Sequence, residues 1–183
     1  MATTTRTVRY EEWLNMPVVD DAIEEVVNGE TRIMPPNKWK HTIVVENLSD
    51  ALKAQVDRKA VRVDATVFGL IIRKTPLTSR VPDLAVFIKQ NIVEQDGYIH
   101  SAPELVVEVL SPADTRRLMN EKIRDYESIA ASELWIVSPE AQTVEVLLFQ
   151  NGKLVTERVV TQGQLSSKVF PGVAIDVSSI WPD

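Results

Sequence analysis

The feature that most restricts the fold is an aliphatic run followed by a helical segment and a second apolar run. Residues 105–110 are aliphatic except for Glu108, residues 114–130 have the spacing of a helix, and residues 134–137 are all apolar. Short apolar runs without polar alternation are typical of strands that are covered on both faces. Two such strands joined by a helix predict a βαβ unit with parallel strands. The chain is therefore expected to fold around a sheet that helices cover.

Other segments supply further helices and strands around this unit. Asn28-Gly29 and Asn151-Gly152 stand between strand-like segments and predict β-hairpins, because both turn positions tolerate positive φ. Residues 38–56 have apolar positions at helical spacing and predict an amphipathic helix. The remaining expected elements are a short helix over 9–16 and strands at 61–67, 68–72 and 84–88.

The order of these elements predicts an α/β fold with a mixed central β-sheet, flanking helices and β-hairpin additions. A segregated α+β arrangement is the alternative. The chain has 183 residues, 44% of them hydrophobic, and can bury one sizeable core. We therefore expect a single domain over 1–183, with 1–8 as a flexible N-terminal tail.

Composition and charge exclude several classes of function. The chain contains no cysteine, which rules out disulfides, Cys-based zinc sites and a thiol nucleophile. Its N-terminus lacks an apolar signal core, and no stretch approaches the roughly 20 apolar residues of a membrane helix. We therefore expect a cytoplasmic protein that does not bind membranes. The formal net charge of −6 argues against a broad basic surface for nucleic acid, so any such site should be local or metal-assisted.

Two charged residues occupy positions that local patterning assigns to apolar side chains. Glu108 stands inside the aliphatic run, where a carboxylate loses its hydration unless a cation or hydrogen-bond donors replace the water. Lys122 falls inside the apolar arc of the helix over 114–130, and Glu108 is the nearest anion expected in a βαβ unit. The ordinary interpretations are a strand end that reaches solvent for Glu108 and a snorkelling side chain for Lys122.

A third charged residue, Asp83, follows Pro82 at the start of the strand over 84–88. Asp is so common in turns and caps that this residue alone indicates little. Taken together, an Asp at a strand start, a Glu inside a later strand and a Lys on the following helix match a metal-dependent site. Two neighbouring carboxylates repel each other, and a hard divalent cation is the usual remedy.

These residues resemble the PD-(D/E)xK nuclease superfamily and, within it, the bacterial Uma-type group of restriction-endonuclease-like proteins. The similarity runs over most of the chain, and residues 102–139 are its most specific part. It is carried by residues 25–30, His41, residues 81–84 and 102–112, Lys122 with Tyr126, and residues 134–139.

The resemblance implies a restriction-endonuclease-like core and a Mg²⁺-dependent endonuclease that hydrolyses phosphodiester bonds in DNA, with Mn²⁺ as a substitute. It implies Asp83, Glu108 and the backbone carbonyl of Val109 as metal ligands, Lys122 as the catalytic amine and Glu25 as an extra acidic catalytic group. The rival is a catalytically inactive binding or regulatory module with the nuclease fold. A purely structural domain, in which Glu108 and Lys122 form a buried ion pair, is a third interpretation.

The sequence departs from the family pattern at three positions. The commonest form of the superfamily has its lysine two residues after the second acidic ligand, where this chain has Leu110, so the resemblance implies that Lys122 has taken over from the helix. Leu118 and Ser138 stand where the Uma-type group often has Asp. These two departures weaken the expectation of a second metal site.

Two features around the implied site have more than one interpretation. His41 lies on the apolar face of its helix, where a packed, hydrogen-bonded histidine is the ordinary interpretation and a site role the alternative. Lys38 and Lys40 around Trp39 are either solvated surface residues or contacts for a nucleic-acid backbone. Cutting both strands of a duplex needs two sites, so a homodimer is a further expectation.

Overall fold

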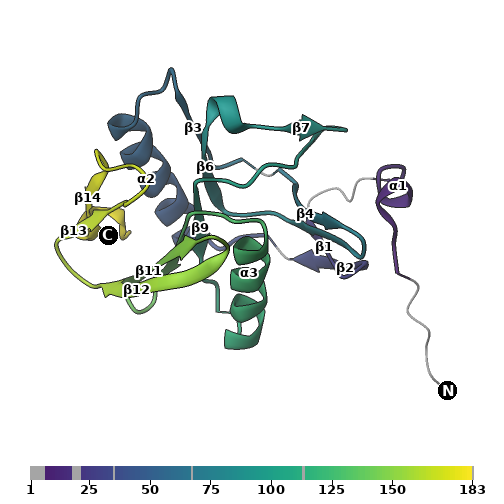
Figure 1. The fold of residues 1–183 in the computed structure, drawn as a ribbon. Helices are drawn as coiled ribbons and strands as arrows, with labels where there is room; N and C mark the ends of the chain where they lie inside the picture. Colours follow the sequence, from purple (N-terminus) through teal and green to yellow (C-terminus); the bar gives the residue numbers. More distant parts are fainter. Residues whose placement is uncertain (1–6, 18–21, 35, 67, 113, 183) are drawn as a thin grey trace. The chain divides into compact units, whose positions relative to one another are not determined.

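The computed structural model describes residues 7–17, 22–34, 36–66, 68–112 and 114–182 (Figure 1). The chain divides into two compact units, which are described separately: unit 1 is Met1–Pro36, Val67–Val81 and Val93–Ser101, and unit 2 is Asn37–Thr66, Pro82–Ile92 and Ala102–Asp183. The predicted tail over 1–8 lies largely outside the described residues. The expectation of a single domain stays a prediction.

Unit 1 is built on a sheet of short strands. Its six strands have the order β2-β1-β5-β4-β8-β7. They are β1 (Ile23–Val27), β2 (Glu30–Met34), β4 (Leu70–Lys74), β5 (Leu77–Arg80), β7 (Glu94–Gln95) and β8 (Tyr98–Ile99), and the short helix α1 spans Tyr10–Trp13. The predicted first hairpin is confirmed, because β1 and β2 pair antiparallel across a turn with φ of 54° at Asn28 and 80° at Gly29.

Unit 2 contains the predicted βαβ unit. Its six-stranded sheet has the order β12-β11-β10-β9-β6-β3. The strands are β3 (Val61–Asp64), β6 (Leu84–Ile88), β9 (Leu105–Val109), β10 (Glu133–Ser138), β11 (Thr143–Gln150) and β12 (Lys153–Val160). Strands β9 and β10 are parallel and are joined through helix α3 (Arg116–Ser128), which confirms the prediction. The mixed α/β fold class is confirmed as well.

The remaining elements of unit 2 surround this sheet. Helix α2 spans Trp39–Gln55, as predicted from its apolar spacing. A two-stranded sheet of β13 (Gln164–Ser166) and β14 (Ala174–Asp176) follows, and the 3-10 turns η1 (Lys89–Asn91) and η2 (Val177–Ile180) complete the unit. Strand β12 is an edge strand of the six-stranded sheet of unit 2. In the described part of the chain, no helix has the length and apolar character needed to cross a membrane.

Helices α2 and α3 lie on opposite sides of the six-stranded sheet of unit 2 (Figure 1). Val44, Leu48 and Leu52 of α2 are fully buried and share one core cluster with alternate residues of the strands, which are Leu84, Val86, Leu105, Val107 and Val109. Successive side chains of a strand point to opposite faces. The intervening Glu108 therefore points to the other face, which α3 covers. Each large aliphatic side chain in the cluster contributes roughly 1.5–3 kcal/mol by burial.

Helix α3 is capped at its N-terminus by a threonine side chain. The Thr115 hydroxyl oxygen accepts a hydrogen bond from the Leu118 backbone N–H at 3.3 Å, so Thr115 is the N-cap. Met119 and Tyr126 are buried on the face that meets the sheet. Lys122 and Tyr126 are four residues apart and therefore project from the same side of the helix. This orients both side chains toward Glu108.

Candidate functional site

The register between β6 and β9 brings Asp83 and Glu108 together. The antiparallel pairs are Leu84 with Val107, Ala85 with Val106, and Val86 with Leu105. One further step along the same register sets Asp83 opposite Glu108. Asp83 directly precedes β6, so the two acidic residues meet at one end of this strand pair.

A side-chain contact extends the pairing by that one step. Pro82 has no backbone N–H and so cannot donate to a sheet hydrogen bond. At the next residue, the Asp83 side chain forms a hydrogen bond to the neighbouring strand: its Oδ2 atom accepts from the Val109 backbone N–H at 2.8 Å. The two carboxylates thus belong to one local structure.

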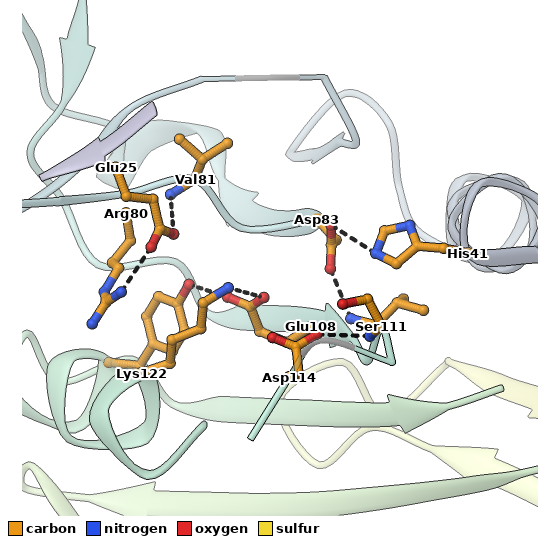
Figure 2. Close-up of polar contacts among 11 residues, drawn as sticks. Glu25, His41, Arg80, Val81, Asp83, Glu108, Ser111, Asp114 and Lys122 are labelled. Carbon is orange, nitrogen blue, oxygen red and sulfur yellow. Dashed lines mark hydrogen bonds and ion pairs between the residues drawn. The ribbon is translucent and has the colours of Figure 1, made fainter. Parts of the chain in front are cut away.

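Glu108 is buried and is held by two donors from helix α3. Its residue is 2% exposed. The Lys122 amine donates to Oε2 at 2.7 Å, and the Tyr126 hydroxyl donates to Oε1. Figure 2 shows the Lys122 amine directed at this carboxylate. A buried carboxylate needs a cation or several donors to replace its lost hydration, and α3 supplies both.

Asp83 is bound from a second helix, α2. The His41 ring nitrogen Nε2 lies 3.2 Å from Asp83 Oδ1, with the His41 side chain 6% and the Asp83 side chain 15% exposed (Figure 2). Burial alone would lower the pKa of His41. The hydrogen bond and charge of Asp83, the charge of Glu108 and the Val109 carbonyl outweigh burial and raise this pKa above its ordinary value of 6.5.

The oxygen atoms gathered here suit a hard divalent cation. Asp83 and Glu108 are carboxylates, and the Val109 main chain adds a carbonyl beside them. Mg²⁺ prefers such oxygen ligands and usually retains several waters, so a partial protein shell is sufficient. Among the described residues, no group of three His, Cys, Asp or Glu side chains could hold a metal ion. The predicted set, with two carboxylates and one carbonyl, leaves its other positions to water or substrate oxygen.

The structure brings together three of the four predicted catalytic side chains in unit 2: Asp83, Glu108 and Lys122. The fourth, Glu25, belongs to unit 1. There Glu25 Oε2 pairs with the Arg80 guanidinium at 2.7 Å, and Oε1 accepts from the Val81 backbone N–H at 3.2 Å (Figure 2). Its role as an extra catalytic acid stays a prediction.

Two contacts of the site were not predicted from the sequence. Tyr126 was expected beside Lys122 as part of the family resemblance, without a role of its own, and its hydroxyl donates to Glu108. Its position four residues after Lys122 was the available signal. The contact between His41 and Asp83 depends on how α2 packs on the sheet, which no local pattern encodes.

The turn that leads from β9 into α3 is closed by the side chain of Asp114. The Ser111 backbone N–H donates to Asp114 Oδ2 at 2.7 Å, and the Asp114 backbone N–H donates to the Ser111 carbonyl at 3.0 Å (Figure 2). These two hydrogen bonds join the end of β9 to the residues just before α3.

Comparisons with known proteins agree on the fold and the family. The sequence matches the Uma2 family, whose description reads "Putative restriction endonuclease", over residues 10–178. A crystal structure described as a "putative nuclease belonging to DUF820" from Anabaena variabilis ATCC 29413 is similar with a TM-score of 0.77. Its sequence identity is 21%, and the match covers 94% of this chain and 97% of that chain, so it shows the shared fold. No curated protein matches the sequence. Because the family match covers nearly the whole chain, the protein belongs to the Uma2 family of restriction-endonuclease-like nucleases.

Proposed function

We propose that the protein is a Mg²⁺-dependent endonuclease that hydrolyses phosphodiester bonds in DNA. The observation that carries this proposal is the convergence of three side chains in unit 2. Asp83 lies opposite Glu108 in the register of β6 and β9, and the Lys122 amine contacts Glu108 at 2.7 Å. Two carboxylates and an amine at one point of a nuclease fold support metal-assisted phosphodiester hydrolysis.

The protein groups that would hold the cation are Asp83, Glu108 and the Val109 carbonyl. A bound Mg²⁺, or Mn²⁺ in its place, would polarise a phosphate oxygen and lower the pKa of a coordinated water. Asp83 is held at Oδ1 by His41 and at Oδ2 by the Val109 N–H, so its carboxylate has a fixed orientation. Tyr126 fixes Glu108 in the same way.

Lys122 would act on the attacking water and on the phosphate. Its side chain is 11% exposed, against 3% for the Glu108 side chain that it contacts. The ammonium would orient the water whose oxygen bonds to phosphorus while the bond from phosphorus to the leaving deoxyribose oxygen breaks. The proton that the water loses would pass through solvent to that leaving oxygen. The ammonium would also stabilise the negative charge that grows on the phosphate oxygens.

A local contact surface beside the site supports a nucleic-acid substrate. Trp39 in the first turn of α2 is 75% exposed and stands between the exposed side chains of Lys38 and Lys40. His41, two residues later, contacts Asp83. Lys40 lies 4.0 Å from Glu140, and both side chains are more than 60% exposed, so this pair is weak. An exposed aromatic ring with flanking lysines suits a base and its phosphates.

The surface around Trp39 can be tested by binding alone. Trp39→Ala should weaken DNA binding by about fivefold, because stacking on one aromatic ring contributes on the order of 1 kcal/mol or more. The measurement is fluorescence anisotropy with a labelled oligonucleotide at a fixed salt concentration. Lys153→Ala, which removes an exposed lysine of β12, is the matched control and should leave the affinity unchanged. Equal affinities of the wild type and Trp39→Ala would remove this support.

The central experiment separates metal binding from chemistry. Plasmid cleavage is measured with Mg²⁺, with Mn²⁺ and with a chelator, and Mn²⁺ binding is measured by calorimetry. Asp83→Asn should lose both metal binding and cleavage. Lys122→Met should lose cleavage while it keeps or tightens metal binding, because a positive charge has been removed from beside the cation. Undiminished cleavage by either folded variant would refute the proposal.

A second candidate function is a catalytically inactive binding or regulatory module. It is favoured by one observation: every carboxylate oxygen of Asp83 and Glu108 already has a donor from the protein. Such a module would bind DNA without cutting it and need not bind Mn²⁺. The calorimetry and cleavage assays above distinguish the two functions.

A homodimer is part of the endonuclease proposal, because two sites are needed to cut both strands of a duplex. Sedimentation measured at micromolar and at higher concentrations, with and without DNA, tests this. A monomer that nevertheless linearises plasmid in a single binding event would contradict it.

A further inference from the structure

We infer that His41 is a positioning residue that orients Asp83 for metal binding, an inference that rests on the proposed function. His41 lies in the first turn of α2 and is 5% exposed. Its Nε2 atom contacts Asp83 Oδ1 at 3.2 Å, and the Val109 N–H contacts Asp83 Oδ2 at 2.8 Å. The Asp83 carboxylate is thereby held at both ends, by a helix on one side and by a strand on the other.

The unused ring nitrogen distinguishes His41 from an ordinary packed histidine. Among the described residues, its Nδ1 atom is buried and has no hydrogen-bond partner. A buried polar atom without a partner costs roughly 1–3 kcal/mol. A histidine kept only for packing would be expected to satisfy both nitrogens or to be replaced by an apolar residue. The other ring nitrogen, Nε2, contacts Asp83 Oδ1.

The contact of the ring places it at the proposed metal site. Asp83, which His41 contacts at Oδ1, also accepts from the Val109 N–H at Oδ2 and lies one step beyond the paired residues of β6 and β9, next to Glu108 in the register. The function of His41 is therefore to hold a ligand in place, which is how hydrogen-bonding partners around metal ligands raise metal affinity.

The expected effect is on metal affinity. Loss of such a partner typically weakens metal binding by about 10- to 100-fold. His41→Ala should therefore raise the dissociation constant for Mn²⁺ by that factor. His41→Gln should restore most of the affinity, because its amide nitrogen can donate to Asp83 from nearly the position of Nε2. His41→Asn is too short to do so and should behave like His41→Ala.

The test is calorimetric titration of the full-length protein with MnCl₂ in the absence of DNA. Circular dichroism and thermal unfolding without metal establish that each variant is folded. If His41→Ala does not fold, the comparison of His41→Gln with His41→Asn carries the test. His100→Gln is the matched control, since His100 belongs to unit 1 and contacts Tyr10 there at 3.2 Å, and it should bind Mn²⁺ as the wild type does.

Each outcome decides the matter. Weak binding by His41→Ala and His41→Asn, with near-normal binding by His41→Gln, supports the inference. Unchanged affinity in His41→Asn, or equal weakening in His41→Gln and His41→Asn, overturns it while the proposed function stands. Absence of Mn²⁺ binding by the wild type overturns the proposed function and this inference with it.

Discussion

Two buried carboxylates on neighbouring strands of unit 2 are stabilised in opposite ways. Glu133 in β10 is fully buried and accepts hydrogen bonds from the Trp135 indole at 2.7 Å, the Ser167 hydroxyl at 2.7 Å and the Lys168 backbone N–H at 3.0 Å. Glu108 in β9 is bound by Lys122, whose side chain is 11% exposed, and by Tyr126. Burial of an acidic residue therefore does not by itself identify a site.

The difference lies in the donors. The donors around Glu133 are fixed groups of the fold, and they connect the sheet to the segment that follows β13. The donor at Glu108 that carries a charge is a long side chain at the edge of solvent, and a second carboxylate, Asp83, lies opposite. A closed shell of fixed donors stabilises the fold, whereas a charged pair beside a second acid leaves room for a cation.

The largest expected effect is on catalysis at Glu108. Glu108→Gln retains an oxygen that can accept from Tyr126 or Lys122 but removes the negative charge that would bind the cation. Cleavage should fall by on the order of 100- to 1000-fold, comparable to the loss of one key transition-state contact. The melting temperature should fall as well, because the change removes the negative partner of Lys122, but by less than in Glu133→Gln, since the Tyr126 hydroxyl can rotate to accept from the new amide. Cleavage rates and thermal unfolding of the same preparation check both statements, and a variant that cuts normally would break the comparison.

The second largest effect is expected at Glu133, where a substitution should lower stability and leave the cleavage rate unchanged. Glu133→Gln sets an amide N–H₂ against donors that require an acceptor, so the free energy of unfolding should fall by about 2–3 kcal/mol. Cleavage per folded molecule should stay at the wild-type rate. Urea unfolding and active-site-normalised cleavage measure the two quantities. Loss of activity in a folded Glu133→Gln protein would show that the two carboxylates are not functionally distinct.

A smaller effect is expected from Tyr126→Phe. This change removes the hydroxyl that donates to Glu108 and leaves the ring and its packing intact. Because the Glu108 carboxylate then loses one of the hydrogen bonds that orient it, cleavage should fall by about tenfold. Steady-state rates measured over a range of Mn²⁺ concentrations test this, with a higher metal requirement as the expected sign. Wild-type rates at every Mn²⁺ concentration would show that the Tyr126 hydroxyl does not contribute to metal binding or cleavage.

The smallest effect should come from a third carboxylate of the same sheet. Burial raises the pKa of Asp64, but hydrogen bonds from Thr66 and Arg62 outweigh it, so the pKa lies below 3.8. A lowered pKa means that the stabilisation is present above pH 3.8 and is lost as the pH falls through the folded-state pKa. Asp64 is partly exposed, so Asp64→Asn should cost less than about 1 kcal/mol at pH 7.

The pH dependence of that last variant is the informative part. The difference in unfolding free energy between the wild type and Asp64→Asn should shrink steadily as the pH is lowered below 4. Urea unfolding at a series of pH values measures it. A difference that stays constant across the series would mean that the contacts of Asp64 do not depend on its charge.

Local sequence patterns predicted much of unit 2 and three of the side chains that meet there. The aliphatic run at 105–110 and the helical spacing at 114–130 are local signals, and Glu108 and Lys122 stood out because each breaks its own pattern. Asp83 became informative only in combination with them. The structure adds the register that sets Asp83 opposite Glu108, which depends on how two strands pair rather than on either strand alone.

The features that sequence reasoning missed depend on contacts between distant segments. The second six-stranded sheet includes β7 and β8, which have two residues each and are too short to show any periodicity. Glu133 directly precedes an apolar run, and its partners near Ser167 lie more than 30 positions away. Such contacts are decided by tertiary packing, which local propensity does not encode.

Strand β12 has a consequence for how molecules of this protein meet one another. It ends the sheet and carries exposed Leu154, Val155 and Val159. A terminal strand of this length offers peptide groups to which another chain can add, and Lys153 and Glu157 along it limit such growth by charge. Strands β11 and β10 separate it from β9. Intermolecular strand addition at β12 would therefore leave access to Glu108 unobstructed, so crowding or self-association there is compatible with an open reaction centre.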